Sequence, residues 1–386
     1  MCTLPQYTTN VWLLSSPFFA GSLTPVRTGT YNAGTVRYQM QVATSEEPMT
    51  ADPDFPTEAP DLDAIRARCE ELFAEIGKVI VGQEYIVQNL AAAMLARGHC
   101  LLVGVPGLAK TLLVKTLARA LSWDFKRIQF TPDLMPGDII GTELLETDQM
   151  TGDRRLRFVP GPLFANVVLA DEINRTPPRT QSALLEAMQE VAVTVAGRTM
   201  PIGRPFFVVA TQNPIEQEGT YPLPEAQLDR FMFSLTLDYP TRGQEEHVAV
   251  STTRDDEPDV RPVLTREDVM AMQHLVRTVP VSPHVASYAV SLARASRPHD
   301  DDAIPLVRKY VEWGAGPRAS QYLVLGAKAR AVLSGRPAPS ANDVRSVAHQ
   351  VLDHRILPNY AGVADGITPG ALVDEILRQV REPDYA

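Results

Sequence analysis

Cysteine is scarce in this chain of 386 residues, and basic residues are outnumbered by acidic ones. The three cysteines, Cys2, Cys69 and Cys100, are too few and too far apart for a disulfide framework or a zinc site, which favours a reducing compartment such as the cytoplasm. Lysine and arginine total 36 against 46 acidic residues, a formal net charge of −10, which argues against a general nucleic-acid binder. The sequence also lacks any apolar run near the roughly 18 residues of a membrane-spanning helix.

The first 60 residues lack the periodicity of a folded domain. Positions 1–45 contain no aspartate or glutamate, and serine, threonine, proline, glycine and tyrosine dominate. No lysine or arginine precedes the apolar patch at Val11–Ala20, so the charged start of a signal peptide is missing. We therefore predict a disordered extension over residues 1–60, with a translation start at Met40 or Met49 as the alternative.

From Leu62 onward the pattern changes to that of a folded α/β protein. Apolar residues recur at helical spacing from Leu62 to Val79, and a second predicted helix ends near Ala96. Short apolar runs of strand length then alternate with helical stretches, which favours a parallel sheet covered by helices on both faces. The predicted strands are Cys100–Val103, Arg127–Phe130, Asn166–Ala170, Phe206–Ala210 and Met232–Leu237, and the predicted helices between them are Lys110–Leu121, Arg179–Val191 and Glu225–Asp229.

No comparable strand pattern follows Tyr239-Pro240. Amphipathic helices are predicted instead over residues 265–296, 318–333 and 340–356, separated by turns that contain proline and glycine. We therefore predict an α/β domain at residues 61–240 and a smaller helical domain at residues 241–386.

A glycine-bearing loop follows the first predicted strand and leads into a helix. Gly104 and Gly107 allow backbone amides to curl around phosphate oxygens, and the helix N-terminus presents free N–H groups to the same anion. Lys110 would reach the β- and γ-phosphates of a nucleotide, and the Thr111 hydroxyl would bind Mg²⁺. Ala109 departs from the strict pattern, which has glycine at that position. The predicted phosphate-binding residues are Gly104, Val105, Pro106, Gly107, Leu108, Ala109, Lys110 and Thr111.

Two adjacent acids, Asp171 and Glu172, follow the third predicted strand. Adjacent side chains on a strand point in opposite directions. Asp171 would then face Mg²⁺, while Glu172 would face the attacking water as its base or orienter. A solvated helix cap is the alternative for an isolated acidic pair, but the position about 60 residues after a phosphate-binding loop favours the catalytic interpretation.

Asn213 stands at the carboxyl end of the fourth predicted strand, the edge at which α/β proteins bind ligands. Its amide would hold the attacking water or the γ-phosphate. The alternative interpretation is a turn residue before Pro214.

Together these segments resemble the AAA+ ATPases, and within them the MoxR family, over about residues 62–356. The further segments that carry the resemblance are Phe130–Leu134, Gly161–Phe164, Ala170–Arg175, Gln181–Glu190, Ala210–Pro214 and Tyr221–Phe231. The resemblance implies a three-layer αβα P-loop NTPase core with a parallel sheet, followed by a smaller all-α lid. The implied cofactors are ATP and Mg²⁺.

The resemblance also implies roles that spacing alone does not show. It identifies Gly104–Thr111 with Walker A, Asp171 and Glu172 with Walker B, and Asn213 with sensor 1.

Two arginines take their roles from the resemblance alone. Arg230 corresponds to the arginine finger that reaches a neighbour's γ-phosphate, and Arg318 to sensor 2, which would act with Lys110 in its own subunit. Val81 and Gly82 fall where the family wraps the adenine.

Two inserted hairpins fit the helix-2-insert branch of this superfamily. In the first, Leu144–Thr147 would pair with Arg155–Val159 across a turn at Asp148–Asp153, and in the second Val191–Val195 would pair with Thr199–Ile202. The family resemblance implies a ring, expected to be a hexamer, that assembles or activates protein complexes in a chaperone-like manner. It also implies a partner with a von Willebrand factor A domain and a protein client.

Three other functions remain open at this point. A nucleic-acid motor shares the two insertions but would need basic hairpins, whereas the second hairpin offers only Arg198 and Arg204. The ATPase subunit of a magnesium-chelatase-like complex would share the same fold. A nucleotide-regulated binding module without turnover is disfavoured by the presence of Glu172 and Arg230.

Overall fold

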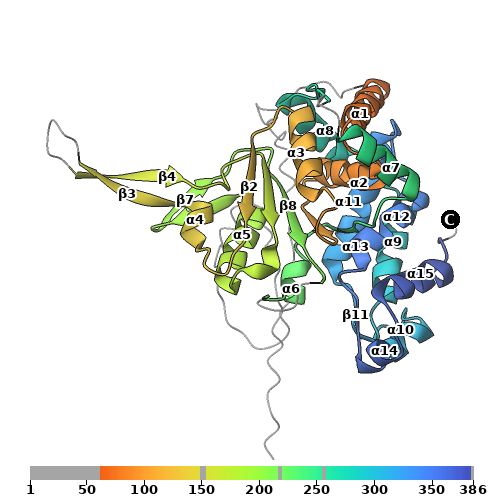
Figure 1. Cartoon of the computed structure of the whole chain (residues 1–386). Helices are drawn as coiled ribbons and strands as arrows, with labels where there is room; N and C mark the ends of the chain where they lie inside the picture. Colours follow the sequence, from red (N-terminus) through yellow and green to blue (C-terminus); the bar gives the residue numbers. More distant parts are fainter. Residues whose placement is uncertain (1–60, 148–153, 216–219, 254–257, 384–386) are drawn as a thin grey trace, which may run out of the picture. The chain divides into compact units, whose positions relative to one another are not determined.

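A parallel sheet of five strands lies at the centre of the α/β part of the chain (Figure 1). The computed structural model describes residues 61–147, 154–215, 220–253 and 258–383, so the extension predicted at residues 1–60 and the turn predicted at Asp148–Asp153 lie outside the described residues. The strand order is β2-β5-β8-β1-β9. Their bounds are β1 Cys100–Val103, β2 Phe125–Gln129, β5 Val167–Asp171, β8 Phe207–Gln212 and β9 Phe233–Thr236.

Both faces of this sheet are buried. Successive strand residues point to opposite sides, and the residues on each side belong to an apolar core. Leu102 and Leu169 belong to an apolar core that includes Leu113 of α3. Their strand neighbours Leu101 and Ala170 belong to a second core, on the other face, with side chains of α5. The sheet is thus the middle of three layers, which confirms the predicted αβα fold. The main helices of these layers are α1 Leu62–Gly77, α2 Glu84–Leu95, α3 Lys110–Ala120 and α5 Pro178–Glu190.

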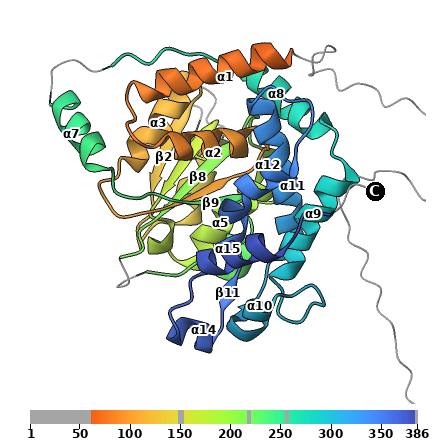
Figure 2. The same cartoon turned by 90° about the vertical axis from the view of Figure 1, so that its right-hand side faces the viewer.

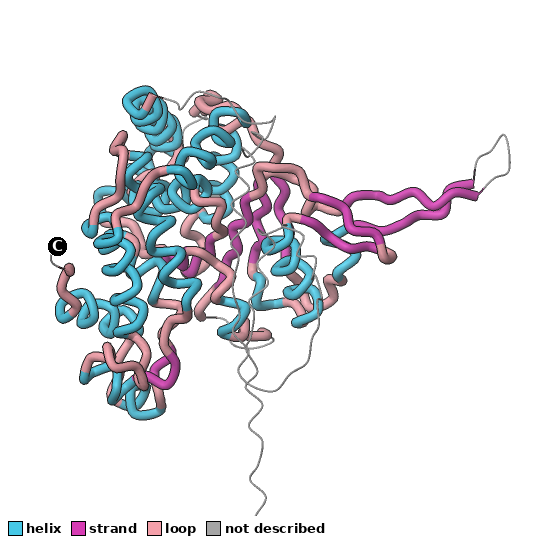
Figure 3. The backbone as a smooth tube through the Cα atoms, turned by 180° about the vertical axis from the view of Figure 1, so that it is seen from behind, coloured by secondary structure: helices cyan, strands magenta, loops and turns pink. Residues whose placement is uncertain are grey.

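Two antiparallel hairpins are inserted into this α/β core. The longer one joins β3 Gly141–Thr147 to β4 Arg154–Pro160, with Leu145 opposite Leu156, and it extends away from the sheet (Figures 1 and 3). The shorter one joins β6 Ala192–Val195 to β7 Arg198–Pro201. The strand pairings predicted for both insertions are confirmed. Short helical segments flank them at α4 Pro136–Ile140, η1 Ile173–Arg175 and α6 Glu225–Leu228.

A helical region follows β9, as predicted (Figure 2). The single helix predicted over residues 265–296 is wrong, because Pro280 interrupts it and Ser282 caps a new helix by accepting a hydrogen bond from the Val285 N–H. The region also contains a short ribbon of β10 Val311–Trp313 and β11 Leu357–Pro358. The helices are α7 Arg242–Ser251, α8 Arg266–Thr278, α9 Pro283–Ala295, α10 Pro305–Tyr310, α11 Pro317–Leu333, α12 Ala341–Ser346, α13 Ala348–Leu352, α14 Tyr360–Ala364 and α15 Pro369–Gln379.

Helix α11 brings the helical region against the edge strand of the sheet. A Cβ atom placed on Gly326 would lie 3.1 Å from the Phe233 ring of β9 and 3.1 Å from the Val347 side chain, so a larger residue would push the helix outward. This close contact fixes the first turn of α11, which carries Arg318, relative to the start of β9. The domain division predicted near residue 240 stays a prediction.

None of the helices in the described residues combines the length and the apolar character needed to span a lipid bilayer.

Candidate active site

The predicted phosphate-binding loop joins the end of β1 to the start of α3, and its backbone takes left-handed turns at two positions. Gly107 has φ +88°, and Ala109 has φ +55°. Lys110 begins α3, and its Nζ donates to the Gly104 carbonyl oxygen at 2.5 Å. Within the described residues, no side chain caps the N-terminus of α3, and an uncapped helix N-terminus is a position at which proteins bind anions.

Ala109 shows why alanine is tolerated where the strict pattern has glycine. The left-handed conformation costs a residue with a Cβ atom about 1–2 kcal/mol, and alanine has the smallest such side chain. The Ala109 residue is exposed, so its methyl group meets solvent rather than packed atoms. The loop therefore keeps the expected geometry at a small conformational cost.

Asp171 is the last residue of β5, and its buried carboxylate is held from two sides. Its Oδ2 lies 2.6 Å from Arg127 Nη2 and accepts a second bond from Arg127 Nε at 3.0 Å. Its Oδ1 accepts a hydrogen bond from the Thr211 hydroxyl at 2.6 Å. The carboxylate is therefore fixed at the carboxyl edge of the sheet, which is the edge from which the phosphate-binding loop starts.

Glu172 does not lie on the strand, so the prediction that strand alternation would orient it is wrong. Its backbone is left-handed, with φ +59°, and it precedes a short 3-10 helix. The Glu172 carboxylate accepts from Gln129 Nε2 at 2.7 Å and lies 3.1 Å from Arg175 Nε. A turn, together with these two side chains, sets the direction of the carboxylate.

Thr211 is a site residue that our sequence reasoning missed. Its hydroxyl donates to Asp171 Oδ1 and also accepts from the Glu172 backbone N–H at 2.9 Å. One buried hydroxyl thus couples the positions of both acids. The available signal was a polar residue at the carboxyl end of an otherwise apolar strand, beside Asn213.

Asn213 follows β8 and is 4% exposed. Its Oδ1 accepts from the Ile215 backbone N–H at 3.2 Å, which is the turn geometry that we considered as the alternative. β8 lies between β5 and β1 in the sheet, so Asn213 also shares the carboxyl edge with Asp171 and the phosphate-binding loop. The structure therefore combines the turn role with a position suited to catalysis.

Arg230 and Arg318 lie at the amino ends of the parallel strands, which we call the amino edge of the sheet. Arg230 precedes β9, which runs parallel to β1, so it is level with the start of β1, whereas the phosphate-binding loop follows its end. Four strand residues, about 13 Å, separate these two levels. Arg318 Nη1 lies 3.2 Å from Asp229 Oδ2, and Tyr322 of α11 donates to the Arg230 carbonyl oxygen at 3.3 Å.

The prediction that Arg318 acts with Lys110 of its own subunit is therefore wrong in this arrangement. Asp229 holds Arg318 beside Arg230, and it also binds Arg355 Nε at 2.8 Å, a side chain that is 2% exposed. Burial lowers the pKa of Arg355, and the Asp229 carboxylate opposes that shift. Sequence reasoning missed this anchor because residues 229 and 355 are adjacent only in the folded chain.

The residues predicted to surround the adenine lie between α1 and α2. Gly82 has φ +76° and lies against the side chain of Gln244 in α7, and Val81 is half-buried. Val81 and Gly82 therefore belong to a loop that contacts α7 through the Gln244 side chain.

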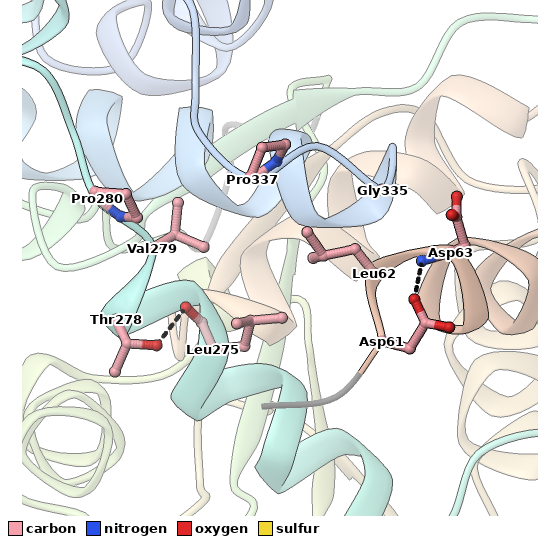
Figure 4. A pocket seen from close by; sticks show the side chains of 9 residues that line it. All are labelled: Asp61, Leu62, Asp63, Leu275, Thr278, Val279, Pro280, Gly335 and Pro337. Carbon is pink, nitrogen blue, oxygen red and sulfur yellow. Dashed lines mark hydrogen bonds between the residues drawn. The ribbon is translucent and has the colours of Figure 1, made fainter. Parts of the chain in front are cut away.

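An open hollow of about 570 Å³ lies between the first turn of α1 and the end of α8 (Figure 4). Leu62 and Val279 face each other across it, and Pro337 lies beside them. Its lining residues in the described part of the chain include no lysine or arginine, so its chemistry does not suit a phosphate. The carboxyl edge of the sheet remains the candidate nucleotide site.

The side chains at the carboxyl edge offer hard oxygen donors, which suit Mg²⁺. The Thr111 hydroxyl and the Asp171 carboxylate are such donors, at the start of α3 and the end of β5. In the described residues, no group of three or more His, Cys, Asp or Glu side chains is placed to hold a metal by itself. This donor set fits a Mg²⁺ that keeps several waters and is held largely by phosphates.

Comparison with known proteins agrees with this geometry. Residues 99–233 match the model of the ATPase family associated with various cellular activities (AAA), and residues 305–376 match the AAA lid domain. The chain is 40% identical to Chaperone MoxR1 of Mycobacterium tuberculosis over 355 residues, 92% of each chain. It is 30% identical to Protein MoxR of Paracoccus denitrificans, covering 82% of this chain and 97% of that protein.

A solved structure is also similar over most of its length. The crystal structure of a putative ATPase from Cytophaga hutchinsonii matches with a TM-score of 0.77 and 41% identity, covering 84% of this chain and 97% of that one. The structure thus combines an αβα core, a loop of the phosphate-binding type followed by an acidic strand end, and a helical lid region. Relatives that match this chain over most of their length support the same assignment. The chain belongs to the MoxR-type AAA ATPases.

Proposed function

We propose that this protein hydrolyses Mg²⁺-ATP at interfaces between copies of the chain arranged in a ring, and that the ring has six copies. One observation carries this proposal: Lys110 lies beyond the carboxyl ends of the parallel strands, whereas Arg230 lies before their amino ends. A protomer can therefore bind a nucleotide at one edge and offer arginines to another nucleotide at the other edge. Head-to-tail contacts of this kind close into a ring when the rotation between successive copies closes, as we propose here.

In the proposed mechanism, the chain binds the triphosphate before it orients the water. The backbone N–H groups at the start of α3 and the Lys110 ammonium bind the β- and γ-phosphates. Thr111 and Asp171 would hold Mg²⁺, which would offset the negative charge of the phosphates.

Glu172 then accepts the proton of the attacking water, with Gln129 and Arg175 holding its carboxylate in place. Asn213 contributes its amide to the same edge. These roles need no movement of the sheet, because the Thr211 hydroxyl already forms hydrogen bonds with both Asp171 and Glu172.

Arg230 and Arg318 supply positive charge from the neighbouring copy. Charge placed on the equatorial oxygens of the transferring phosphoryl group accelerates hydrolysis by roughly 10³–10⁵ when it comes from an arginine finger. Because Asp229 holds Arg318 beside Arg230, the two guanidinium groups are presented together. We therefore assign both arginines to the neighbour's site.

For the cellular role we propose chaperone-like remodelling of protein complexes in the cytoplasm, together with a partner that carries a von Willebrand factor A domain. The long hairpin supports a polypeptide client, because Leu144, Leu145 and Leu156 are at least half exposed on it. Exposed apolar side chains on a ribbon suit contact with another protein. A nucleic-acid motor would instead need a strong excess of basic side chains there. The strand β4 contains three arginines against two glutamates in β3, and Arg157 is paired with Glu146 at 2.9 Å.

The test is the rate of ATP hydrolysis per copy as a function of protein concentration, with assembly followed by light scattering in the same samples. We expect turnover to rise with assembly, because Arg230 reaches a nucleotide only across an interface. Equal turnover by isolated copies would contradict the proposal.

A further inference from the structure

A small cavity at the amino edge of the sheet is lined by four arginines. It has a volume of about 180 Å³. Arg97 follows α2, Arg230 precedes β9, Arg277 lies in the last turn of α8, and Arg318 lies in the first turn of α11. Two guanidinium groups thus come from segments that flank the strands, and two come from helices that follow the sheet.

Positive charge in this cavity greatly exceeds negative charge. Arg318 is paired with Asp229, which is shared with Arg355. Within the described residues, Arg97, Arg230 and Arg277 take part in no ion pair. Like charges near one another repel, and an anion bound between them offsets this repulsion.

Arg97 and Arg277 have few partners for their polar atoms. The Nε of Arg97 is buried without a hydrogen-bond partner in the described residues, and the Arg97 backbone is left-handed, with φ +58°. Arg277 donates one bond, from Nη2 to the Ala96 carbonyl oxygen at 3.3 Å. Burial lowers the pKa of both arginines, and for Arg97 the nearby charges of Arg204 and Arg277 add to the effect.

The size and chemistry of the cavity select its ligand. It is smaller than the roughly 300–1,000 Å³ of sites for drug-sized molecules, so it cannot enclose a nucleoside. It has room for one phosphoryl group, which the planar guanidinium recognises through paired hydrogen bonds. Lys110 of the same copy lies at the other edge of the sheet and cannot deliver a phosphate to it.

We propose that Arg97 and Arg277 join Arg230 and Arg318 in a receptor for the terminal phosphoryl group of a nucleotide bound by a neighbouring copy. This inference rests on the proposed function, which already assigns Arg230 and Arg318 to the neighbour's site. It adds two catalytic residues, and because Arg277 and Arg318 belong to α8 and α11, the phosphoryl group would tie these helices to the sheet edge.

The decisive variants are Arg277→Gln and Arg97→Gln, with Arg378→Gln as the matched control. Arg378 is exposed on α15 and pairs with Glu375 of the same helix. We expect the first two variants to lose about 10²-fold in kcat while their equilibrium affinity for ATP stays unchanged. The control should keep the wild-type rate. Wild-type kcat in both cavity variants would overturn the inference.

Mixing shows whether the lost group acts across an interface. In a one-to-one mixture of Arg277→Gln and Glu172→Gln proteins, about a quarter of the interfaces combine an intact Glu172 in one copy with an intact Arg277 in its neighbour. About a quarter of the wild-type turnover should therefore return. A mixture that stays inactive would overturn the assignment to a neighbour's nucleotide. Failure of the proposed function is separate, because the assembled wild-type protein would then release no phosphate.

Free phosphate is the other source of the same chemistry. Inorganic phosphate is added to the full-length Lys110→Ala protein, whose own nucleotide site is disabled, and thermal unfolding is followed. A rise in midpoint that Arg277→Gln abolishes, together with a mixture that stays inactive, would show a free-phosphate site and overturn the neighbour's role. No phosphate effect together with rescue in the mixture supports the proposal.

Discussion

Replacing Thr211 by valine tests whether one hydroxyl holds both acids of the candidate site. Valine keeps the shape of threonine, so the change removes the hydrogen bonds to Asp171 and Glu172 without opening a cavity. The lost bond to a carboxylate and the unsatisfied backbone N–H together should lower the free energy of unfolding by about 3 kcal/mol. Displacement of the two acids by about 1 Å should lower ATP turnover by about 10².

The measurements are urea unfolding and steady-state phosphate release, each compared with two further variants. Thr211→Ser keeps the hydroxyl and should keep nearly wild-type turnover, at a stability cost of about 1 kcal/mol for the lost methyl group. Thr176→Val is the matched control, because the buried Thr176 hydroxyl has no hydrogen-bond partner in the described residues. If Thr211→Val behaved like Thr176→Val, the coupling of the acids through Thr211 would be refuted.

Four further changes follow from the same geometry. Lys110→Ala should abolish nucleotide binding, measured by equilibrium titration with a fluorescent ATP analogue. Glu172→Gln should still bind ATP while phosphate release nearly ceases, and normal turnover would contradict the role of Glu172. Ala109→Gly should raise the free energy of unfolding by about 1 kcal/mol, because glycine adopts the left-handed conformation without strain; an unchanged urea midpoint would argue against strain there. Burial lowers the pKa of His99 from 6.5 to about 4, so the unfolded chain binds the proton first and stability should fall as the pH drops below about 6.5. Urea unfolding at about pH 7.5 and about pH 5 should show a fall of about 2 kcal/mol, and His99→Gln should reduce it.

Sequence pattern predicted the sheet and the loop between β1 and α3 well, because both depend on local composition. A strand buried on both faces is apolar along its length, as at residues 167–170 of β5, and a loop that turns left-handed needs glycine or a small residue. Proline also marks helix ends, and Pro280 separates α8 from α9 although the amphipathic pattern continues across it.

Residues that depend on tertiary contacts were harder to place. The left-handed turn at Glu172 depends on a bond to Thr211, 39 positions away in sequence. The position of Arg318 depends on its pairing with Asp229, which no local pattern encodes. A family resemblance singled out Arg318, but the structure was needed to show the edge of the sheet to which it belongs.

The central claim is that each ATP is held by one copy and hydrolysed with arginine from the next. The most direct measurement is phosphate release by an equimolar mixture of Arg230→Ala and Glu172→Gln proteins, each almost inactive alone. In mixed rings, about a quarter of the interfaces combine an intact Glu172 with an intact Arg230 from the adjacent copy, so that share of the wild-type rate should return. A mixture no faster than its components, although it assembles as the wild type does, would contradict the account.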